Sequence, residues 1–269
     1  MPATTRASWA VKVPEITAIF WAIKILTTAM GESLSDFLVA HNEVIAVAIG
    51  LFGFLFAMWL QFRADRYVPW IYWFAVAMVA VFGTMAADGA HVVVGLPYPV
   101  TTTLYALALV VIFVLWYRSE GTLSIHSINT RRREVYYWLT VLATFALGTA
   151  TGDLCAATLH LGYFGSGVLF TVVILIPAIG RWRLGFNSVF AFWFAYVITR
   201  PIGASFADWF GKPHHHGAVA NGLGLGDGAV AGLLIVAIVA LVGYLSVQRS
   251  SAGRHDASLS ALQPEVETG

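Results

Sequence analysis

The chain has 269 residues, of which 59% are hydrophobic and only 11% are charged, and its formal net charge is +1. Soluble domains carry about 25% charged residues, so this composition excludes an ordinary soluble domain. The near-neutral charge gives no argument for a nucleic-acid partner, and a single cysteine, Cys155, excludes an internal disulfide framework.

Eight apolar segments are predicted to cross a membrane as helices, since about 20 apolar residues span a bilayer. In chain order they cover 14–38, 44–62, 68–93, 101–118, 134–160, 164–182, 188–210 and 226–247. The prediction is an all-α integral membrane protein with a single transmembrane domain over 1–250. Residues 251–269 are polar and are predicted to form a disordered cytoplasmic tail. The N-terminus lacks a cleavage pattern, so the first span is expected to be retained.

One spaced signature returns four times: an aromatic residue, Trp, nine residues, Gly, three residues, a small residue and Asp. The copies are Phe20-Trp21–Gly31–Ser35–Asp36, Tyr72-Trp73–Gly83–Ala87–Asp88, Tyr137-Trp138–Gly148–Gly152–Asp153 and Phe192-Trp193–Gly203–Ala207–Asp208. Each copy lies on the first of two predicted spans. The sequence therefore predicts four tandem two-helix repeats, at about 12–62, 66–118, 132–183 and 186–247.

The basic residues predict the topology. Twelve of the 15 Lys and Arg fall on one side of the predicted spans, and Lys212 stands alone on the other side. The positive-inside rule then makes both termini cytoplasmic. Two spans per repeat give all four repeats the same orientation.

The glycines and tryptophans of the signature are expected to pack helices. Gly and the small residue lie four apart, a spacing that lets helices approach closely in lipid. A Trp at a fixed offset is expected to contact the same neighbour in every repeat. The predicted packing residues are Gly31, Gly83, Gly148, Gly203, Trp21, Trp73, Trp138 and Trp193. The second helix of each repeat is largely featureless and is expected to face lipid.

Four aspartates at one depth point to a function, because a charge inside a bilayer is costly unless it is paired or hydrated. The alternative is that each Asp only caps or hydrogen-bonds a neighbouring helix end. Glu32 lies one helical turn before Asp36, so both side chains share a face. Threonines continue this polar stripe. The predicted ion-binding set is Glu32, Asp36, Asp88, Asp153 and Asp208, with Thr28, Thr84 and Thr149.

Two bases fall within the predicted spans. Lys24 and Arg200 are expected to act as counter-charges to the acids, and Arg200 to neutralise Asp208 two turns away on its own helix. Three acids then remain unmatched, and protonation or a bound cation would compensate them.

Histidines follow the Asp of each repeat on the outer side: His41, His91, His160 and the run 214–216. We regard His91, His160 and His41 as weak metal-ligand candidates. A mixture of carboxylate and imidazole suits Mn, Zn, Fe, Co or Ni better than Ca.

The segment from Lys12 to Asp36, KVPEITAIFWAIKILTTAMGESLSD, resembles the opening of a bacterial inner-membrane family. That family, domain of unknown function 347, has four tandem repeats of two transmembrane helices, each repeat with a marked tryptophan. The resemblance covers about 12–247 and implies a multi-pass protein of the bacterial inner membrane, but it brings no activity. The fourth repeat departs from the pattern of the first at Arg200 and Ala204.

The leading hypothesis is a transporter of a cation, with a divalent metal as substrate and protons as the exchanged ion. A carrier of a small anionic solute that uses Lys24 and Arg200 is the first alternative, and a non-transporting scaffold or sensor is the second. The sequence shows no nucleophile–base set, so an enzyme is not expected. The expected partners are the lipid bilayer and the substrate, with no resident cofactor and no nucleic acid. Pseudo-fourfold and pseudo-twofold arrangements of the repeats remain equally open.

Overall fold

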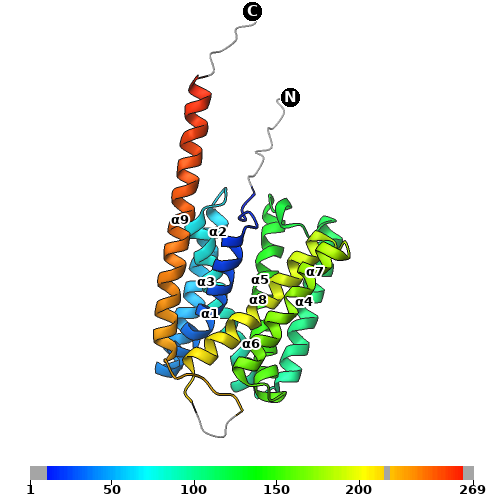
Figure 1. Ribbon diagram of the computed structural model, residues 1–269, viewed down its shortest axis with the longest axis vertical. Helices are drawn as coiled ribbons and strands as arrows, with labels where there is room; N and C mark the ends of the chain where they lie inside the picture. The colour runs from blue at the N-terminus through cyan, green and yellow to red at the C-terminus, as the bar shows by residue number, and fades with distance from the viewer. Residues whose placement is uncertain (1–10, 215–218, 263–269) are drawn as a thin grey trace, which may run out of the picture.

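The computed structural model describes residues 11–214 and 219–262, which form helices and no strand (Figure 1). The elements are α1 (Ala18–His41), α2 (Glu43–Arg63), α3 (Pro69–Val92), α4 (Tyr98–Glu120), η1 (Ile125–Ser127), α5 (Arg131–Asp153), η2 (Leu154–Thr158), α6 (Gly162–Val173), α7 (Leu175–Arg183), α8 (Ser188–Gly211) and α9 (Asp227–Leu262).

Local capping explains several of the helix ends. The Thr17 hydroxyl accepts a hydrogen bond from the backbone N–H of Phe20 at 3.2 Å and begins α1. Asn42 ends α1, and its side chain accepts from Ile45 N at 3.0 Å, so the same residue begins α2. Each of the eight apolar segments of the sequence overlaps a helix, and the sixth is divided into α6 and α7.

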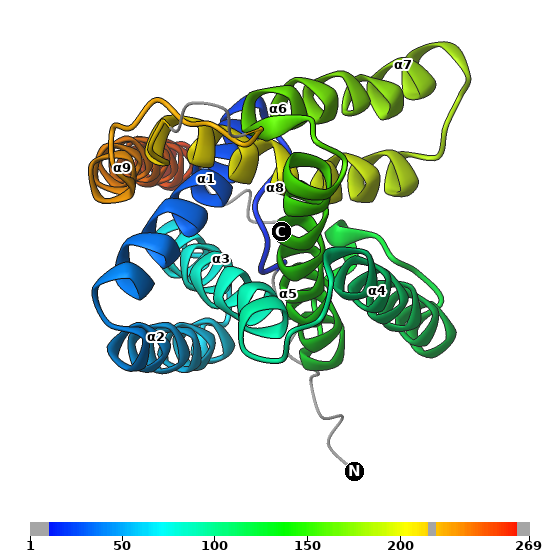
Figure 2. The same cartoon turned by 90° about the horizontal axis from the view of Figure 1, so that it is seen from below.

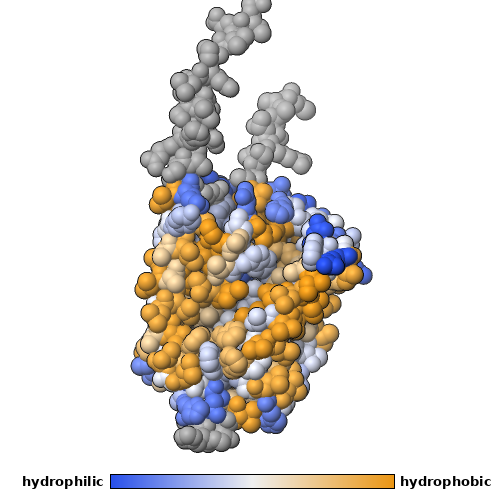
Figure 3. All heavy atoms as spheres, in the orientation of Figure 1, coloured by the Kyte–Doolittle hydropathy of each residue, from blue (hydrophilic) through white to orange (hydrophobic). Residues whose placement is uncertain are grey.

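Seven of the described helical segments are long and apolar enough to cross a membrane. The first helix is long enough, but it carries Lys24, Glu32 and Asp36 and is not among the seven. On the face that Figure 3 shows, apolar side chains form a broad band, and polar side chains gather toward its two ends. The chain is accordingly a multi-pass membrane protein.

Four inner helices, α1, α3, α5 and α8, pack in a closed circle (Figure 2). The glycine of each signature copy lies against a residue of the neighbouring inner helix. A Cβ on Gly31 would meet Ala80, one on Gly83 would meet Phe145, one on Gly148 would meet Arg200, and one on Gly203 would meet Thr28. In each case the residue that the glycine contacts belongs to the next repeat and lies eight positions before the Asp of that repeat. The glycine of the fourth repeat contacts the first repeat, which closes the circle. The small-residue seam thus joins each repeat to its successor.

The aromatic residues follow the same cyclic rule. The residue before each Trp packs against the Trp of the next repeat, and the ring-centroid distances are similar. These pairs are Phe20–Trp73 at 5.6 Å, Tyr72–Trp138 at 5.6 Å, Tyr137–Trp193 at 6.1 Å and Phe192–Trp21 at 5.7 Å. The fixed offset of the tryptophans in the sequence therefore corresponds to one repeated contact.

The outer helix of each repeat packs against the inner helix of the next repeat. These pairs are α2 on α3, α4 on α5, α6 on α8 and α9 on α1. In the most apolar stretch of each outer segment, between 17% and 28% of the residues are buried inside the protein. The corresponding share in α3, α5 and α8 is 56% to 61%. The helices that carry the signature therefore form the inner layer. Of the two symmetries that the sequence left open, this arrangement is pseudo-fourfold.

Two segments differ from the sequence predictions. The sixth predicted span is interrupted at Ile174, because Pro177 has no N–H to donate to the carbonyl of Val173. The predicted disordered tail begins at 251, whereas α9 is helical as far as Leu262.

Candidate functional site

Acidic side chains from all four repeats line one cavity of about 350 Å³. It lies at the end of the inner helices where α1 and α3 finish, opposite the end where α1 begins. We call it the acidic cavity, and its polar lining is Glu32, Asp36, Glu43, Asp88, His91, Tyr98, Asp153, Tyr163, Asp208 and Lys212. The four aspartates of the signature thus face one shared space, rather than four separate helix ends.

Three of these acids form a tight group. Glu32, Asp36 and Asp88 each place one carboxylate oxygen within 4.8 Å of the others. Glu32 is buried, and both aspartates are half-buried. Carboxylate oxygens gathered at such distances repel one another unless a proton or a cation lies between them. This group is therefore the part of the cavity best suited to hold a metal ion.

Asp153 and Asp208 complete the acidic wall from α5 and α8. Asp153 is the last residue of α5 and is followed directly by the π-helical turn η2, a type of distortion that occurs often at functional sites. Asp208 is almost fully buried, with 5% of its surface exposed. Among the described residues, neither forms an ion pair with a lysine or arginine.

Lys212 is the one basic side chain among the lining residues, apart from His91. Its Nζ lies 2.5 Å from Asp36 Oδ2 and 3.9 Å from Asp227 Oδ2. Burial disfavours the charged form of Lys212, but the charges of Asp36 and Asp208 outweigh burial and raise the pKa of the ammonium group above its ordinary value. From the sequence, Lys212 served only to predict the topology and was not assigned to the site, although its position one turn after Asp208 places it near the same face.

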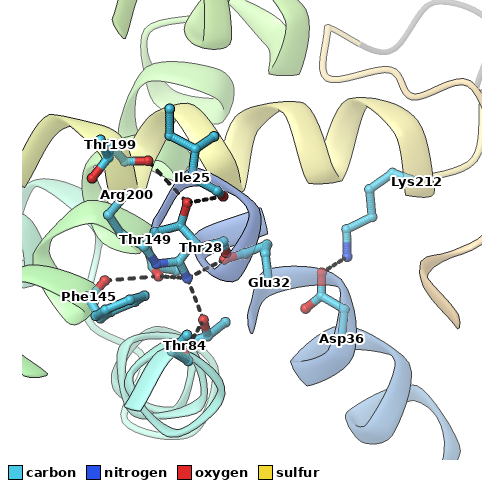
Figure 4. Close-up of polar contacts among 11 residues, drawn as sticks. Ile25, Thr28, Glu32, Asp36, Thr84, Phe145, Thr149, Thr199, Arg200 and Lys212 are labelled. Atoms are coloured by element: carbon cyan, nitrogen blue, oxygen red, sulfur yellow. Dashed lines mark hydrogen bonds and ion pairs between the residues drawn. The ribbon is translucent and has the colours of Figure 1, made fainter. Parts of the chain in front are cut away.

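Arg200 closes the deep end of the site (Figure 4). This side chain is fully buried, and its Nη2 donates to Glu32 Oε2 at 2.5 Å, to Thr149 Oγ1 at 2.7 Å and to Thr84 Oγ1. Its Nη1 donates to the carbonyl oxygen of Thr28 at 3.2 Å. One guanidinium thus joins all four inner helices.

This network corrects the roles assigned to the polar stripe. Thr84 and Thr149, predicted to bind the ion, hold Arg200 instead, and none of the three threonines lines the acidic cavity. The hydroxyl of Thr28 donates to the carbonyls of Ile25 and Thr199. Arg200 is the counter-charge of Glu32 and not of Asp208. The eight residues from Arg200 to Asp208 rise about 12 Å along the helix, too far for a direct contact.

Lys24 is also placed differently from the prediction. Its Nζ is buried without a hydrogen-bond partner and lies 4.3 Å from the ring centroids of both Phe145 and Tyr196. No ion pair joins it to an acid in the described part of the chain, so it is not placed as a counter-charge to the acidic cavity.

Only one of the three candidate histidines reaches the cavity. His91 lines it, stacks on Tyr98 with a centroid distance of 3.8 Å, and has its Nδ1 2.7 Å from the carbonyl oxygen of Leu96. His41 and His160 are exposed and outside the lining. His214 is described but is not a lining residue, and 215–216 lie outside the described residues. Nε2 of His91 is thus the imidazole nitrogen available to a ligand.

A family model described as Repeat of Unknown Function (DUF347) matches the chain four times, at residues 19–67, 71–122, 136–185 and 191–251. Each match begins two residues before the Trp of a signature copy and takes in the outer helix that follows. No curated protein and no solved structure matches the chain.

Proposed function

The chain belongs to the DUF347 repeat family, and we propose that it is a membrane transporter that takes a cation into the acidic cavity. The observation that carries this proposal is the meeting of acids from all four repeats in one space, with Glu32, Asp36 and Asp88 close enough to share a ligand. A packing role for each Asp alone gives no reason for the four to converge.

The balance of charge supports a cation. Six carboxylates line the acidic cavity, against one ammonium, that of Lys212. Arg200 lies behind this lining and is already bound to Glu32. In a protein surrounded by lipid, such an excess of negative charge needs cations or protons to compensate it. A positively charged substrate supplies this compensation.

The donor atoms favour a divalent metal, and among metals they favour manganese. Carboxylate oxygens suit Mg, Ca and Mn, whereas imidazole adds affinity for transition metals. The acidic cavity offers several carboxylates and the single imidazole of His91. Mn²⁺ accepts both kinds of ligand and is the substrate we propose. The pocket holds no thiol, so the softest metals are less well matched.

An anionic substrate is supported less well. It was expected to bind Lys24 and Arg200, but neither side chain lines the acidic cavity. Arg200 is occupied by Glu32 and three threonines, and Lys24 lies between two aromatic rings.

We place the protein in the bacterial inner membrane with eight spans, parallel repeats and cytoplasmic termini. The positive-inside rule supports this orientation, because basic side chains gather at the end where α1 begins. The acidic cavity then opens to the periplasm. The first helix completes the eight, since Glu32 and Arg200 neutralise one another within the inner bundle.

Uptake of Mn²⁺ into vesicles that contain the purified protein tests this function. We expect saturable uptake that is lost in Asp36→Asn and in Asp88→Asn, because amides keep the size of the side chain but lose its charge. Asp65→Asn is the matched control, since Asp65 is exposed in the loop between α2 and α3 at the opposite end. Vesicles that take up no Mn²⁺, or uptake that survives both cavity variants, would overturn the proposal.

A further inference from the structure

The ammonium group of Lys212 occupies the acidic cavity in the manner of a bound cation. Lys212 follows the last residue of α8, and its Nζ lies 2.5 Å from Asp36 Oδ2 of α1 (Figure 4). Asp36 belongs, with Glu32 and Asp88, to the group of three carboxylates that is best suited to hold a metal ion. An ammonium and a metal ion held by the same carboxylate would repel each other at short range. A metal ion that binds to this group therefore displaces Lys212.

A second carboxylate lies within reach of the displaced side chain. Asp227 is the first residue of α9, and its Oδ2 lies 3.9 Å from Lys212 Nζ. Its Oδ1 is buried and accepts no hydrogen bond from the residues that the structure describes. A buried carboxylate oxygen without a donor is costly. Because the stem of a lysine is flexible, a small rotation carries the ammonium from Asp36 to Asp227 and supplies a donor there.

The backbone of residues 223–226 holds Asp227 beside the end of α8. Its N–H groups donate to carbonyl oxygens that the end of a helix leaves without helical partners. Asp227 Oδ1 lies against Gly211, where a side chain would overlap it. Asp227 itself does not line the acidic cavity, so the acceptor for the displaced ammonium is fixed apart from the carboxylates that would bind the metal. The hydrogen bonds run from Leu223 N to Trp209 O at 2.6 Å, from Gly224 N to Lys212 O at 2.9 Å, from Leu225 N to Phe210 O at 3.0 Å and from Gly226 N to Gly211 O at 3.1 Å.

The charge of the incoming ion decides whether it can displace Lys212. A monovalent cation brings the same charge as the ammonium that it replaces, so the carboxylates of the acidic cavity gain no attraction from the exchange. The ammonium is also tethered, which keeps its effective concentration beside Asp36 high. A divalent ion brings twice the charge into the same space, and the released ammonium keeps a carboxylate partner in Asp227. The exchange therefore favours divalent over monovalent cations.

On the basis of the proposed function, we propose that Lys212 is an internal cation that selects the substrate by its charge. A divalent metal ion moves the ammonium from Asp36 to Asp227, and a monovalent ion does not. With the metal bound, Asp36 is released to ligate it, and the charge of Asp227 is compensated by Lys212. When the metal leaves, the ammonium returns to Asp36 and keeps Na⁺ and K⁺ out of the empty cavity.

Calorimetric titration of the purified full-length protein with Mn²⁺ tests this role, in NaCl and in N-methylglucamine chloride of equal ionic strength. The wild type is expected to bind Mn²⁺ equally well in both salts, because Lys212 excludes Na⁺. In Lys212→Met, Na⁺ competes for the vacated carboxylates, and the affinity in NaCl is expected to be weaker by about threefold or more. Lys212→Arg keeps the charge and is expected to behave as the wild type. Arg66→Met removes an exposed charge at the opposite end of the inner helices and is the matched control.

Asp227→Asn tests the movement of the ammonium. Where Lys212 is present, this variant is expected to weaken Mn²⁺ binding by about three- to fivefold, the contribution of one partly exposed ion pair. In the Lys212→Met background no ammonium needs a second partner, so Asp227→Asn is expected to have no larger effect than the control Asp65→Asn. An equal loss in both backgrounds would show that Asp227 only attracts cations from a distance, and would overturn the movement.

The outcomes separate the two proposals. Absence of Mn²⁺ binding by the wild type overturns the proposed function, and the role of Lys212 falls with it. Mn²⁺ binding that depends on Na⁺ to the same extent in the wild type and in Lys212→Met overturns the role of Lys212 alone. Lys212→Gln takes the place of Lys212→Met if the methionine variant does not fold.

Discussion

Arg200 of the fourth repeat donates a hydrogen bond to Glu32 of the first repeat, with 2.5 Å between Nη2 and Oε2, and this contact joins the two ends of the repeat array. Both side chains are buried. The fourth repeat has Arg where the first has Thr28, and this departure from the repeat pattern gives the inner bundle its central ion pair. The irregular position is thus the one that ties the four helices together.

Breaking this pair is expected to be costly. Glu32→Gln and Arg200→Met should each lower the free energy of unfolding by about 3–5 kcal/mol, because each leaves a buried charge or its hydrogen-bond partners uncompensated. The double variant should recover part of the loss. Thermal unfolding in detergent measures this, with Arg132→Met, an exposed arginine, as the control. Equal stability of the single variants and the wild type would show that the pair is not a central contact.

The close approach of α1 and α3 at Gly31 is a second test. A Cβ there would meet the side chain of Ala80 and lie 2.9 Å from its carbonyl carbon, which is backbone and yields little. Gly31→Ala should therefore destabilise the protein by about 1–3 kcal/mol through overpacking. Gly89→Ala, on α3 with no atom within 4 Å of the added Cβ, is the control. A Gly31 variant as stable as the Gly89 variant would contradict the tight seam.

Removal of Lys212 should strengthen cation binding. Its charge repels an incoming cation and occupies Asp36, so Lys212→Met is expected to tighten the Mn²⁺ affinity about tenfold, or about 1.4 kcal/mol. Calorimetric titration of both proteins gives this ratio. Weaker binding in the variant would instead make Lys212 a positioning residue for Asp36.

The pH dependence of this effect follows from the raised pKa of Lys212. A raised pKa means that the ammonium's contribution to stability is complete below the ordinary lysine value of about 10.4 and is lost only as the pH rises through the folded value. The affinity ratio between Lys212→Met and the wild type should thus be constant between about pH 8 and about pH 9, where the carboxylates no longer compete for protons. A ratio that changes steeply in this window would show that Lys212 titrates there.

The helices could be predicted from the sequence because apolar runs of about 20 residues leave few alternatives, and capping residues such as Asn42 and prolines such as Pro69 mark their ends. The repeat signature also predicted that equivalent positions share a role. The repeat signature does not show which neighbouring helix each of its positions contacts. Gly148 contacts Arg200 because the seam joins successive repeats, and no spacing within one repeat shows this.

Only part of the site could be predicted, because the sequence does not show which helices contact one another. The convergence of Asp36 and its three equivalents follows from equal depth on parallel helices. The partner of Arg200 does not, since Glu32 is 168 residues away in the chain, and the placement of Lys24 depends on Phe145 and Tyr196, which belong to two other helices. Long-range side-chain contacts therefore decided the roles that the sequence assigned incorrectly.

We expect one carboxylate from each repeat to contribute to a single cation site. Calorimetric titration of the purified protein with Mn²⁺ tests it most directly, using Asp36→Asn, Asp88→Asn, Asp153→Asn and Asp208→Asn, with Asp65→Asn as control. We expect one saturable site, affinity that weakens as the pH falls because protons compete for the carboxylates, and a loss of affinity in every cavity variant but not in the control. Absence of saturable Mn²⁺ binding, or binding unchanged in all four cavity variants, would rule out a cation site shared by the four repeats.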